Sequence, residues 1–180
     1  MAQAFFGGVH PHDMKAATNE KAIEQLAPPA TVVIPMSMHF GAPCTPIVKV
    51  GDQVKVGQKI GEASGFISAN VICSVSGTVK AVEMRRVASG AMVNSIVVTN
   101  DGEYNTVEGL GADRDPSTLS KQDIRTIVKE AGIVGLGGAG FPTNVKLSPK
   151  DENAIDYILL NGAECEPYLT SDYRLMMEAP

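Results

Sequence analysis

A glycine-rich hexapeptide stands at residues 135–140, where Gly-Leu-Gly-Gly-Ala-Gly satisfies the pattern G-x-G-x-x-G. The dinucleotide fingerprint needs a strand before this pattern and a helix that opens directly after it. Here a helical pattern precedes the loop and Phe141-Pro142-Thr143 follows it, so the sequence excludes a Rossmann site. On the motif alone, a plain glycine-rich turn is the better interpretation.

The density of glycine favours a ligand-binding loop instead. Residues 132–140 contain five glycines, and each costs about 1 kcal/mol of backbone entropy relative to Ala. Such a loop is useful where the backbone must approach a ligand closely and direct N–H groups at anionic oxygens. Lys146 lies just downstream and would supply a compensating charge.

A second group of polar residues follows at 161–167, where the sequence is Asn-Gly-Ala-Glu-Cys-Glu-Pro. Glu164 and Glu166 are equally well explained as a solvated acidic turn before Pro167 and as carboxylates beside a cofactor. Cys165 has no base in view, so packing is a better explanation for it than nucleophilic catalysis. His10, His12 and His39 are interpreted as turn and packing residues because no Cys/His spacing typical of zinc surrounds them.

Composition narrows the classes of function. Fifteen basic and twenty acidic residues give a net charge of −5 over 180 residues, which argues against nucleic-acid binding because affinity there comes mainly from phosphate neutralisation. The three cysteines are far apart and lack C-x-x-C spacing, so neither a disulfide framework nor a cluster site is expected. The N-terminus lacks a basic start followed by an apolar stretch, so we expect no secretory signal. No run approaches the roughly 20 apolar residues that span a bilayer.

The elements that must position these residues change character along the chain. Residues 1–28 predict an extended arm with a short helix at 19–26. Short β-branched runs between Thr31 and Asn100, broken by Gly and Pro, predict a small all-β sandwich or barrel. The expected strands are TVVIP, PIVKV, QKIGEA, NVICSV, GTVKAVEM and NSIVVT.

The last third of the chain predicts helices around one strand. Ser120 and Asp123 predict a capping box for a helix that ends at Gly132, with Ile124, Ile127, Val128 and Ala131 on one face. Residues 156–161, Asp-Tyr-Ile-Leu-Leu-Asn, predict a buried strand, and a helix is expected from Ser171.

The β-rich region resembles biotinyl and lipoyl carrier domains, which have the barrel-sandwich hybrid fold. The resemblance rests on the pattern V-x-x-G-D-x-V-x-x-G-Q, with tight turns at Gly51-Asp52 and Gly57-Gln58, and on V-S-G-T-V. Phe66 stands where carriers have the modified lysine, and a phenyl ring cannot form the amide. The resemblance therefore implies a packing or docking module without a swinging arm.

Segments throughout the chain resemble the RnfC family, the C subunits of Rnf ion-translocating electron-transport complexes. They include F-x-G-G-x-H-P near the N-terminus, H-x-G-A-P at 39–43, and L-x-N-G-A-E-C-E-P-Y-L-T-S-D-Y-R near the end. The stretch G-L-G-G-A-G-F-P-T-N-V-K is also similar to the flavin-binding subunit of respiratory complex I. Leu136, Asn144 and Ala163 depart from that second family, where arginine, glycine and aspartate stand.

The resemblance implies roles for individual residues. The four glycines would hold the phosphate and ribityl chain of FMN, Lys146 would lie near the phosphate or the flavin edge, and Phe141 would offer a ring face to the nicotinamide nucleotide. Asn161 would hydrogen-bond the flavin, Glu164 would lie at the flavin and nicotinamide, and Glu166 matches the second glutamate. The glycines are Gly135, Gly137, Gly138 and Gly140.

The predicted fold class is mixed α+β, with a barrel-sandwich hybrid followed by the beginning of an α/β domain that binds FMN and NADH. The predicted divisions are an arm at 1–28, the barrel at 29–100, a linker at 101–118 and the partial flavin domain at 119–180. The resemblance implies that the sequence lacks a C-terminal part, which would carry the iron–sulfur clusters.

The implied function is that of an NADH-oxidising, FMN-binding electron-input subunit, which passes electrons from NADH through FMN to iron–sulfur clusters. Its partners would be NADH and the other subunits of a bacterial membrane complex, on whose cytoplasmic face it would lie without a span of its own. Two alternatives stay open: a soluble flavin electron-transfer protein of the proline or cobalamin reductase type, and a non-enzymatic docking fragment.

Overall fold

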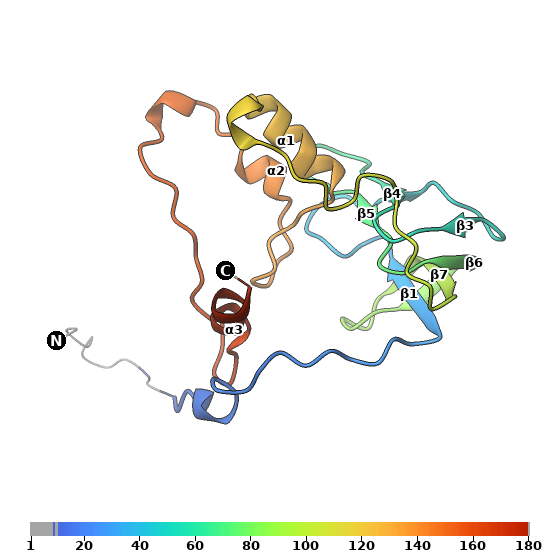
Figure 1. Ribbon diagram of the computed structural model, residues 1–180, viewed down its shortest axis with the longest axis horizontal. Helices are drawn as coiled ribbons and strands as arrows, with labels where there is room; N and C mark the ends of the chain where they lie inside the picture. Colours follow the sequence, from blue (N-terminus) through green and yellow to red (C-terminus); the bar gives the residue numbers. More distant parts are fainter. Residues whose placement is uncertain (1–8, 10, 180) are drawn as a thin grey trace. The chain divides into compact units, whose positions relative to one another are not determined.

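Seven antiparallel strands between Thr31 and Asn100 form two sheets (Figure 1). The computed structural model describes residue 9 and residues 11–179. The larger sheet has the strand order β1-β7-β6-β3, and the smaller has the order β2-β4-β5. The strands are β1 (Thr31–Pro35), β2 (Thr45–Pro46), β3 (Gln53–Val54), β4 (Lys59–Glu62), β5 (Val71–Ile72), β6 (Gly77–Arg86) and β7 (Met92–Asn100).

The apolar core lies between these strands. Strand β7 pairs with both β1 and β6, and its residues 95–98 are buried in succession, which shows that both of its faces are covered. The core therefore draws on both sheets and on the loops between them. Its buried members are Ile34, Met36, Cys44, Val54, Ile60, Val71, Cys73, Val75, Val79, Ile96 and Val98.

Two matching turns confirm the glycine pattern predicted for the barrel. Gly51 has φ +93° and Gly57 has φ +84°, a region that favours glycine. The Asp52 carboxylate accepts a hydrogen bond from Lys49 N at 2.9 Å, and the Gln58 amide oxygen accepts one from Lys55 N at 3.0 Å. Each turn is thus closed by the side chain that follows its glycine.

The predicted strand at PIVKV is wrong beyond its first residue, because strand β2 ends at Pro46. Lys49 already belongs to the Gly51 turn, and Ile47 and Val50 are 50% and 62% exposed. The other five runs overlap strands β1, β4, β5, β6 and β7, and strands β6 and β7 extend beyond the predicted runs. The barrel-sandwich architecture is confirmed.

Helix α1 (Lys121–Glu130) begins as predicted. The Ser120 hydroxyl accepts from Asp123 N at 3.1 Å, and the Asp123 carboxylate accepts from Ser120 N at 2.9 Å, completing the capping box. Ala131 caps the other end and Gly132 follows it with φ +66°. Helix α1 lies beside the short helix α2 (Thr143–Lys146), and no residue of either helix is buried in the described structure.

Two predicted elements are wrong. Residues 156–161 form no strand: Tyr157, Leu159 and Leu160 are between 86% and 94% exposed, since no described strand pairs with them. The helix expected at 19–26 is also missing, and a single 3-10 turn, η1 (Lys15–Ala17), stands just before it. Isolated short helices are marginal without tertiary packing, and here side chains of α3 (Ser171–Glu178) contact this backbone instead.

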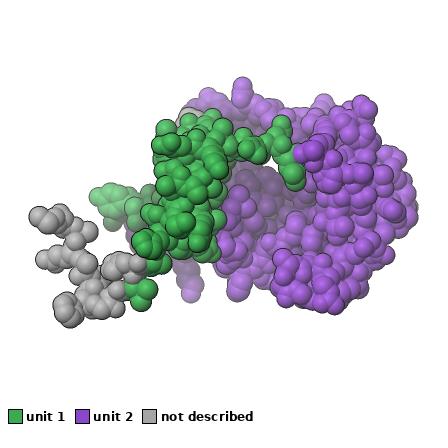
Figure 2. Space-filling model, turned by 90° about the horizontal axis from the view of Figure 1, so that it is seen from below, with its two compact units in different colours: residues 1–26, 156–180 green, residues 27–155 purple. Residues whose placement is uncertain are grey.

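The chain divides into two compact units, coloured separately in Figure 2. One consists of Met1–Leu26 with Asp156–Pro180, and the other is Ala27–Ile155. Within the second unit, residues 105–107 run beside the barrel, where Val56 N donates to Asn105 O and Val107 N donates to Val56 O. The division at 28, 100 and 118 stays a prediction.

Candidate functional site

The glycine-rich segment forms a closed loop on a short two-sided stem. Val134 and Pro142 make an antiparallel bridge, Gly135 N donates to Phe141 O at 2.9 Å, and Thr143 N donates to Ile133 O at 3.0 Å. Residues 136–139 form the turn between these contacts. The loop thus leads from the end of α1 directly into α2.

Two of the loop's glycines adopt conformations that L side chains rarely accept. Gly138 has φ +131° and an added Cβ would meet nothing within 4 Å, so the backbone here faces open space. Gly140 has φ +61°, and an added Cβ would lie 3.2 Å from Met38 O and from His39 Cα. The first glycine leaves room on the loop, whereas the second permits a close backbone contact.

Lys146 folds back over the loop. Its Nζ atom lies 2.5 Å from the position that a Cβ on Gly135 would take, so the absence of a side chain at Gly135 makes room for the ammonium group. A cation held against a loop of glycine backbone has the chemistry of a phosphate-binding cradle. These residues therefore fit the phosphate group of a flavin mononucleotide.

Phe141 stacks on an aromatic residue of the barrel. Its ring centroid lies 5.7 Å from that of Phe40, with 25° between the ring planes. Phe141, the residue predicted to face the nicotinamide, thus packs against Phe40, a residue that the sequence did not mark as part of the site. Phe40 is the variable position of the segment H-x-G-A-P, which is part of the family resemblance. Membership of that segment is the one feature of the sequence that could have pointed to Phe40.

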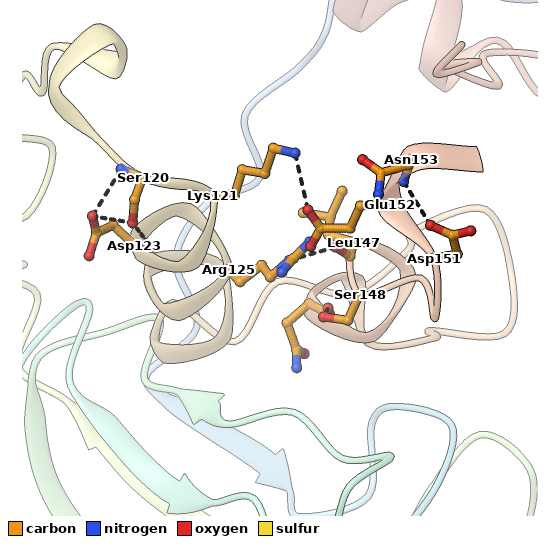
Figure 3. Close-up of polar contacts among 10 residues, drawn as sticks. Ser120, Lys121, Asp123, Arg125, Leu147, Ser148, Asp151, Glu152 and Asn153 are labelled. Carbon is orange, nitrogen blue, oxygen red and sulfur yellow. Dashed lines mark hydrogen bonds and ion pairs between the residues drawn. The ribbon is translucent and has the colours of Figure 1, made fainter. Parts of the chain in front are cut away.

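Polar contacts hold the two helices beside the loop (Figure 3). Arg125 Nε donates to Leu147 O at 2.7 Å, and the Arg125 guanidinium also pairs with Glu152. Lys121 Nζ lies 3.0 Å from the same carboxylate. The hydrogen bond from Arg125, together with that from Lys121, lowers the pKa of Glu152. Glu152 begins the 3-10 turn η3 (Glu152–Ala154).

The acidic segment is held by its own neighbours. The Asn161 side-chain oxygen accepts from Ala163 N at 3.0 Å, and the Glu164 carboxylate accepts from Tyr173 N at 3.1 Å in the first turn of α3. Glu166 is exposed. The carboxylate proposed for flavin contact thus also stabilises the start of a helix.

Lys15 is a positioning residue for this segment that the sequence analysis missed. Its Nζ donates to Leu169 O at 2.6 Å and to Glu166 O at 3.3 Å, and Tyr168 N donates to Asp13 O at 2.6 Å. No local pattern marks these contacts, because about 150 residues separate the partners. The N-terminal arm therefore shapes the turn that follows Glu166.

The predicted site residues fall in both compact units. Residues 135–146, with the glycines, Phe141 and Lys146, belong to the unit Ala27–Ile155. Asn161, Glu164 and Glu166 belong to the unit that contains the arm. Within the first set, Gly135 N donates to Phe141 O and the Lys146 ammonium lies beside Gly135, whereas the side chains of Asn161 and Glu164 each contact other neighbours.

The remaining candidates have other surroundings. His39 Nε2 accepts from Ala69 N at 3.2 Å, as the packing interpretation predicts, while His10 lies outside the described residues, as do Phe5, Gly7 and Gly8 of the N-terminal motif. Among the described residues, no His, Cys, Asp and Glu side chains gather in a way that could hold a metal ion.

The cysteines fall into two classes. Burial raises the pKa of Cys44 and of Cys73, which marks them as inert core residues. Cys165 is exposed, so the expectation that it packs in the interior is wrong.

Phe66, at the position of the carrier lysine, is 80% exposed between β4 and β5.

Family comparisons agree with this geometry. Residues 3–103 match the family model of the RnfC barrel-sandwich hybrid domain, and residues 128–180 match that of the Nuo51 FMN-binding domain. The fold is thus a barrel-sandwich hybrid followed by part of an FMN-binding domain.

Several curated proteins are similar over nearly the whole chain. The C subunit of the Na(+)-translocating ferredoxin:NAD(+) oxidoreductase complex of Acetobacterium woodii is 49% identical over 96% of this chain and 39% of its own length. The corresponding subunit of the proton-translocating complex of Clostridium ljungdahlii is 46% identical over 99% of this chain and 39% of its own length. The C subunit of the ion-translocating oxidoreductase complex of Rhodobacter capsulatus is 43% identical over 96% of this chain and 33% of its own length. The chain therefore spans about two fifths of the first two relatives.

Proposed function

Since the chain belongs to the RnfC family, we propose that it supplies the FMN-binding part of the NADH-oxidising, electron-input subunit of an ion-translocating membrane complex. The observation that carries the proposal is the glycine loop with the Lys146 ammonium lodged at Gly135. That arrangement offers a positive charge and open backbone to one anionic group, which is what the phosphate of FMN requires.

Each of the predicted residues has a distinct task in this proposal. Lys146 and the backbone of Gly135, Gly137, Gly138 and Gly140 hold the phosphate and ribityl chain. Phe141 presents a ring to the nicotinamide nucleotide, and Asn161 donates to or accepts from the flavin ring. Bound there, FMN would supply the chemistry that accepts a hydride from NADH and passes electrons singly to iron–sulfur clusters.

The acidic segment would tune the electrostatics of the flavin. Negative charge at Glu164 and Glu166 disfavours an anionic reduced flavin and so lowers its reduction potential. Tyr173 N donates to the Glu164 carboxylate, which orients this charge within its own unit. Orientation of reacting groups and fixed charge are the contributions that a protein makes to cofactor chemistry.

The partners in this proposal are NADH and the other subunits of the complex. None of the helices in the described ranges has the length and apolar character needed to cross a bilayer. In the same proposal, the neighbouring subunits attach the protein at the cytoplasmic face of the bacterial membrane.

Titration of the purified chain with FMN, followed by flavin fluorescence with and without NADH, tests the proposal. Lys146→Met is expected to raise the dissociation constant for FMN roughly 10- to 100-fold, because a charge-assisted hydrogen bond to phosphate is lost. Gly135→Ala is a second probe: its methyl group displaces the flexible end of Lys146, while the nearest backbone atom beyond its chain neighbours, Phe141 O, lies at an ordinary contact distance of 3.8 Å. It should weaken FMN binding while leaving the melting temperature unchanged.

Lys150→Met is the matched control, since Lys150 is an exposed lysine four residues further along the chain. It should bind FMN like the parent chain. A parent chain that neither quenches FMN fluorescence nor gains thermal stability from FMN contradicts the proposal. Equal effects of Lys146→Met and Lys150→Met would remove the glycine loop as the phosphate site.

A further inference from the structure

The barrel contacts the glycine loop directly through the segment that follows β1. Phe40 N donates to Gly140 O at 3.0 Å, and the Phe40 ring stacks on Phe141 at a centroid distance of 5.7 Å. One barrel residue therefore fixes both the backbone at the end of the loop and the ring of the next residue. Phe40 is itself 55% exposed, so it does not belong to the apolar core.

Gly140 makes this contact possible. Its φ of +61° and the 3.2 Å separation of a hypothetical Cβ from Met38 O and His39 Cα mean that two backbones meet without a side chain between them. Backbone contacts of this kind are less adaptable than contacts between flexible side-chain ends. The position of the loop is thereby tied to that of residues 38–40.

Those barrel residues are in turn firmly attached. His39 Nε2 accepts from Ala69 N at 3.2 Å and lies 3.0 Å from Ala42 O, and Ala42 N donates to Ile67 O at 2.9 Å. Ser68 is 1% exposed and its hydroxyl donates to Ala42 O at 2.8 Å. Hydrogen bonds to residues 67–69 therefore hold the segment that carries Phe40 in place.

The other end of the glycine loop is attached to the same barrel. Asn70 is 4% exposed, its side-chain oxygen accepts from Ala63 N at 3.0 Å, and its Nδ2 donates to Lys129 O at 3.3 Å. A Cβ on Gly132 would lie 2.3 Å from Asn70 O. The Lys59 ammonium adds an ion pair with Glu130 at 3.0 Å. Helix α1 thus reaches the loop from a point already anchored to the barrel.

We propose that the barrel is a component of the nucleotide site, and that Phe40 is the positioning residue that sets the glycine loop and the Phe141 ring for the flavin nucleotide. This inference rests on the proposed function. It differs from the docking role that a carrier-like module without its lysine implies, because the barrel acts here on a loop of its own chain. Asn70 assists by fixing the helix that precedes the loop.

Phe40→Ala and Phe66→Ala form a matched pair of substitutions. Both remove an exposed phenyl ring from the barrel, but only Phe40 stacks on Phe141. Hydrogen exchange of the FMN-free chain should become faster at the amides of residues 135–141 and 143 in Phe40→Ala and stay unchanged in Phe66→Ala. The dissociation constant for FMN should rise about 2- to 12-fold in Phe40→Ala, the range that loss of an aromatic pair supports.

Phe40→Tyr separates positioning from general stability. A tyrosine keeps the stacked ring, so FMN affinity and the visible circular dichroism of the bound flavin should return to those of the parent chain. Unchanged exchange at 135–143 in Phe40→Ala, or equal effects of Phe40→Ala and Phe66→Ala, would overturn the inference. If the parent chain binds no FMN, the proposed function fails, while the exchange measurement still decides whether Phe40 positions the loop.

Discussion

The barrel and the segments that carry the predicted flavin residues are stabilised in different ways. The barrel encloses a core in which Ile60, Ile96 and Val98 are 0% exposed. Helices α1, α2 and α3, by contrast, contain no buried residue in the described structure. One region therefore rests on apolar burial, which supplies most of the favourable free energy of folding.

The flavin segments rest instead on individual contacts to neighbouring elements, which are mostly hydrogen bonds together with the ring stack of Phe40 on Phe141. The glycine loop and α1 are held by Phe40 and Asn70 of the barrel, and the acidic segment is held by Lys15 of the arm. Weakly packed elements open at lower free energy than a core does. The candidate site therefore takes its geometry from the elements that surround it.

Loss of core volume in the barrel gives the largest expected effect. Ile96→Ala should lower the free energy of unfolding by about 2–5 kcal/mol, because a fully buried side chain leaves a cavity. Ile124→Ala, at a position of α1 that is 39% exposed, should cost less than about 1 kcal/mol. Chemical denaturation followed by circular dichroism measures both changes.

The two isoleucines also test whether the loop depends on the barrel. Ile96→Ala should speed hydrogen exchange at residues 135–143 as well as in β7, the strand that carries Ile96. Exchange that quickens in β7 alone would mean that the glycine loop is independent of the barrel.

The close approach of α1 to the barrel gives the next largest effect. Gly132→Ala places a Cβ 2.3 Å from Asn70 O at a residue with φ +66°, so we expect a cost of about 2–3 kcal/mol. Gly109→Ala is the control, because Gly109 has φ +76° but nothing within 4 Å of an added Cβ. Its cost should be only about 1 kcal/mol. Equal losses in denaturation experiments would show that the barrel exerts no constraint at Gly132.

Local chemistry explains how much could be predicted from the sequence. The turns at Gly51 and Gly57 and the capping box at Ser120 are closed by residues three positions apart, so their signals lie within one short window. The stacking of Phe40 on Phe141 joins distant parts of the chain and leaves no such signal. The run at 156–161 has the composition of a strand, but a strand exists only with a pairing partner.

Removal of the Lys15 charge should act on the arm unit alone. Lys15→Met takes away the donor to Glu166 O and Leu169 O, and we expect a cost of about 1 kcal/mol or less because the residue is half-buried and solvent still screens its charge. Limited proteolysis between residues 160 and 170 should become faster. Lys21→Met is the matched control on the same arm, since Lys21 is exposed and makes no side-chain hydrogen bond to a described residue.

The smallest expected effect comes from protonation of Glu152. This residue belongs to η3 and joins that turn to helix α1. Hydrogen bonds from Arg125 and Lys121 lower its pKa in the folded protein below the usual 4.5. Because the folded-state pKa is lowered, the contact contributes its full stability above the ordinary pKa of 4.5 and loses it as the pH falls through the folded-state pKa. Glu152→Gln cannot ionise, so its free energy of unfolding should fall less steeply below pH 4.5 than that of the parent chain.

Denaturation at neutral pH and at about pH 3 compares the two proteins across this window. Glu108→Gln, at an exposed position outside the contact, should keep the pH dependence of the parent chain. Identical pH dependence in Glu152→Gln and Glu108→Gln would show that the ion pair does not hold η3 to α1. Because Glu152 is remote from the barrel core, exchange at β7 should not change in either variant, and this keeps the two ways of stabilising the molecule experimentally separate.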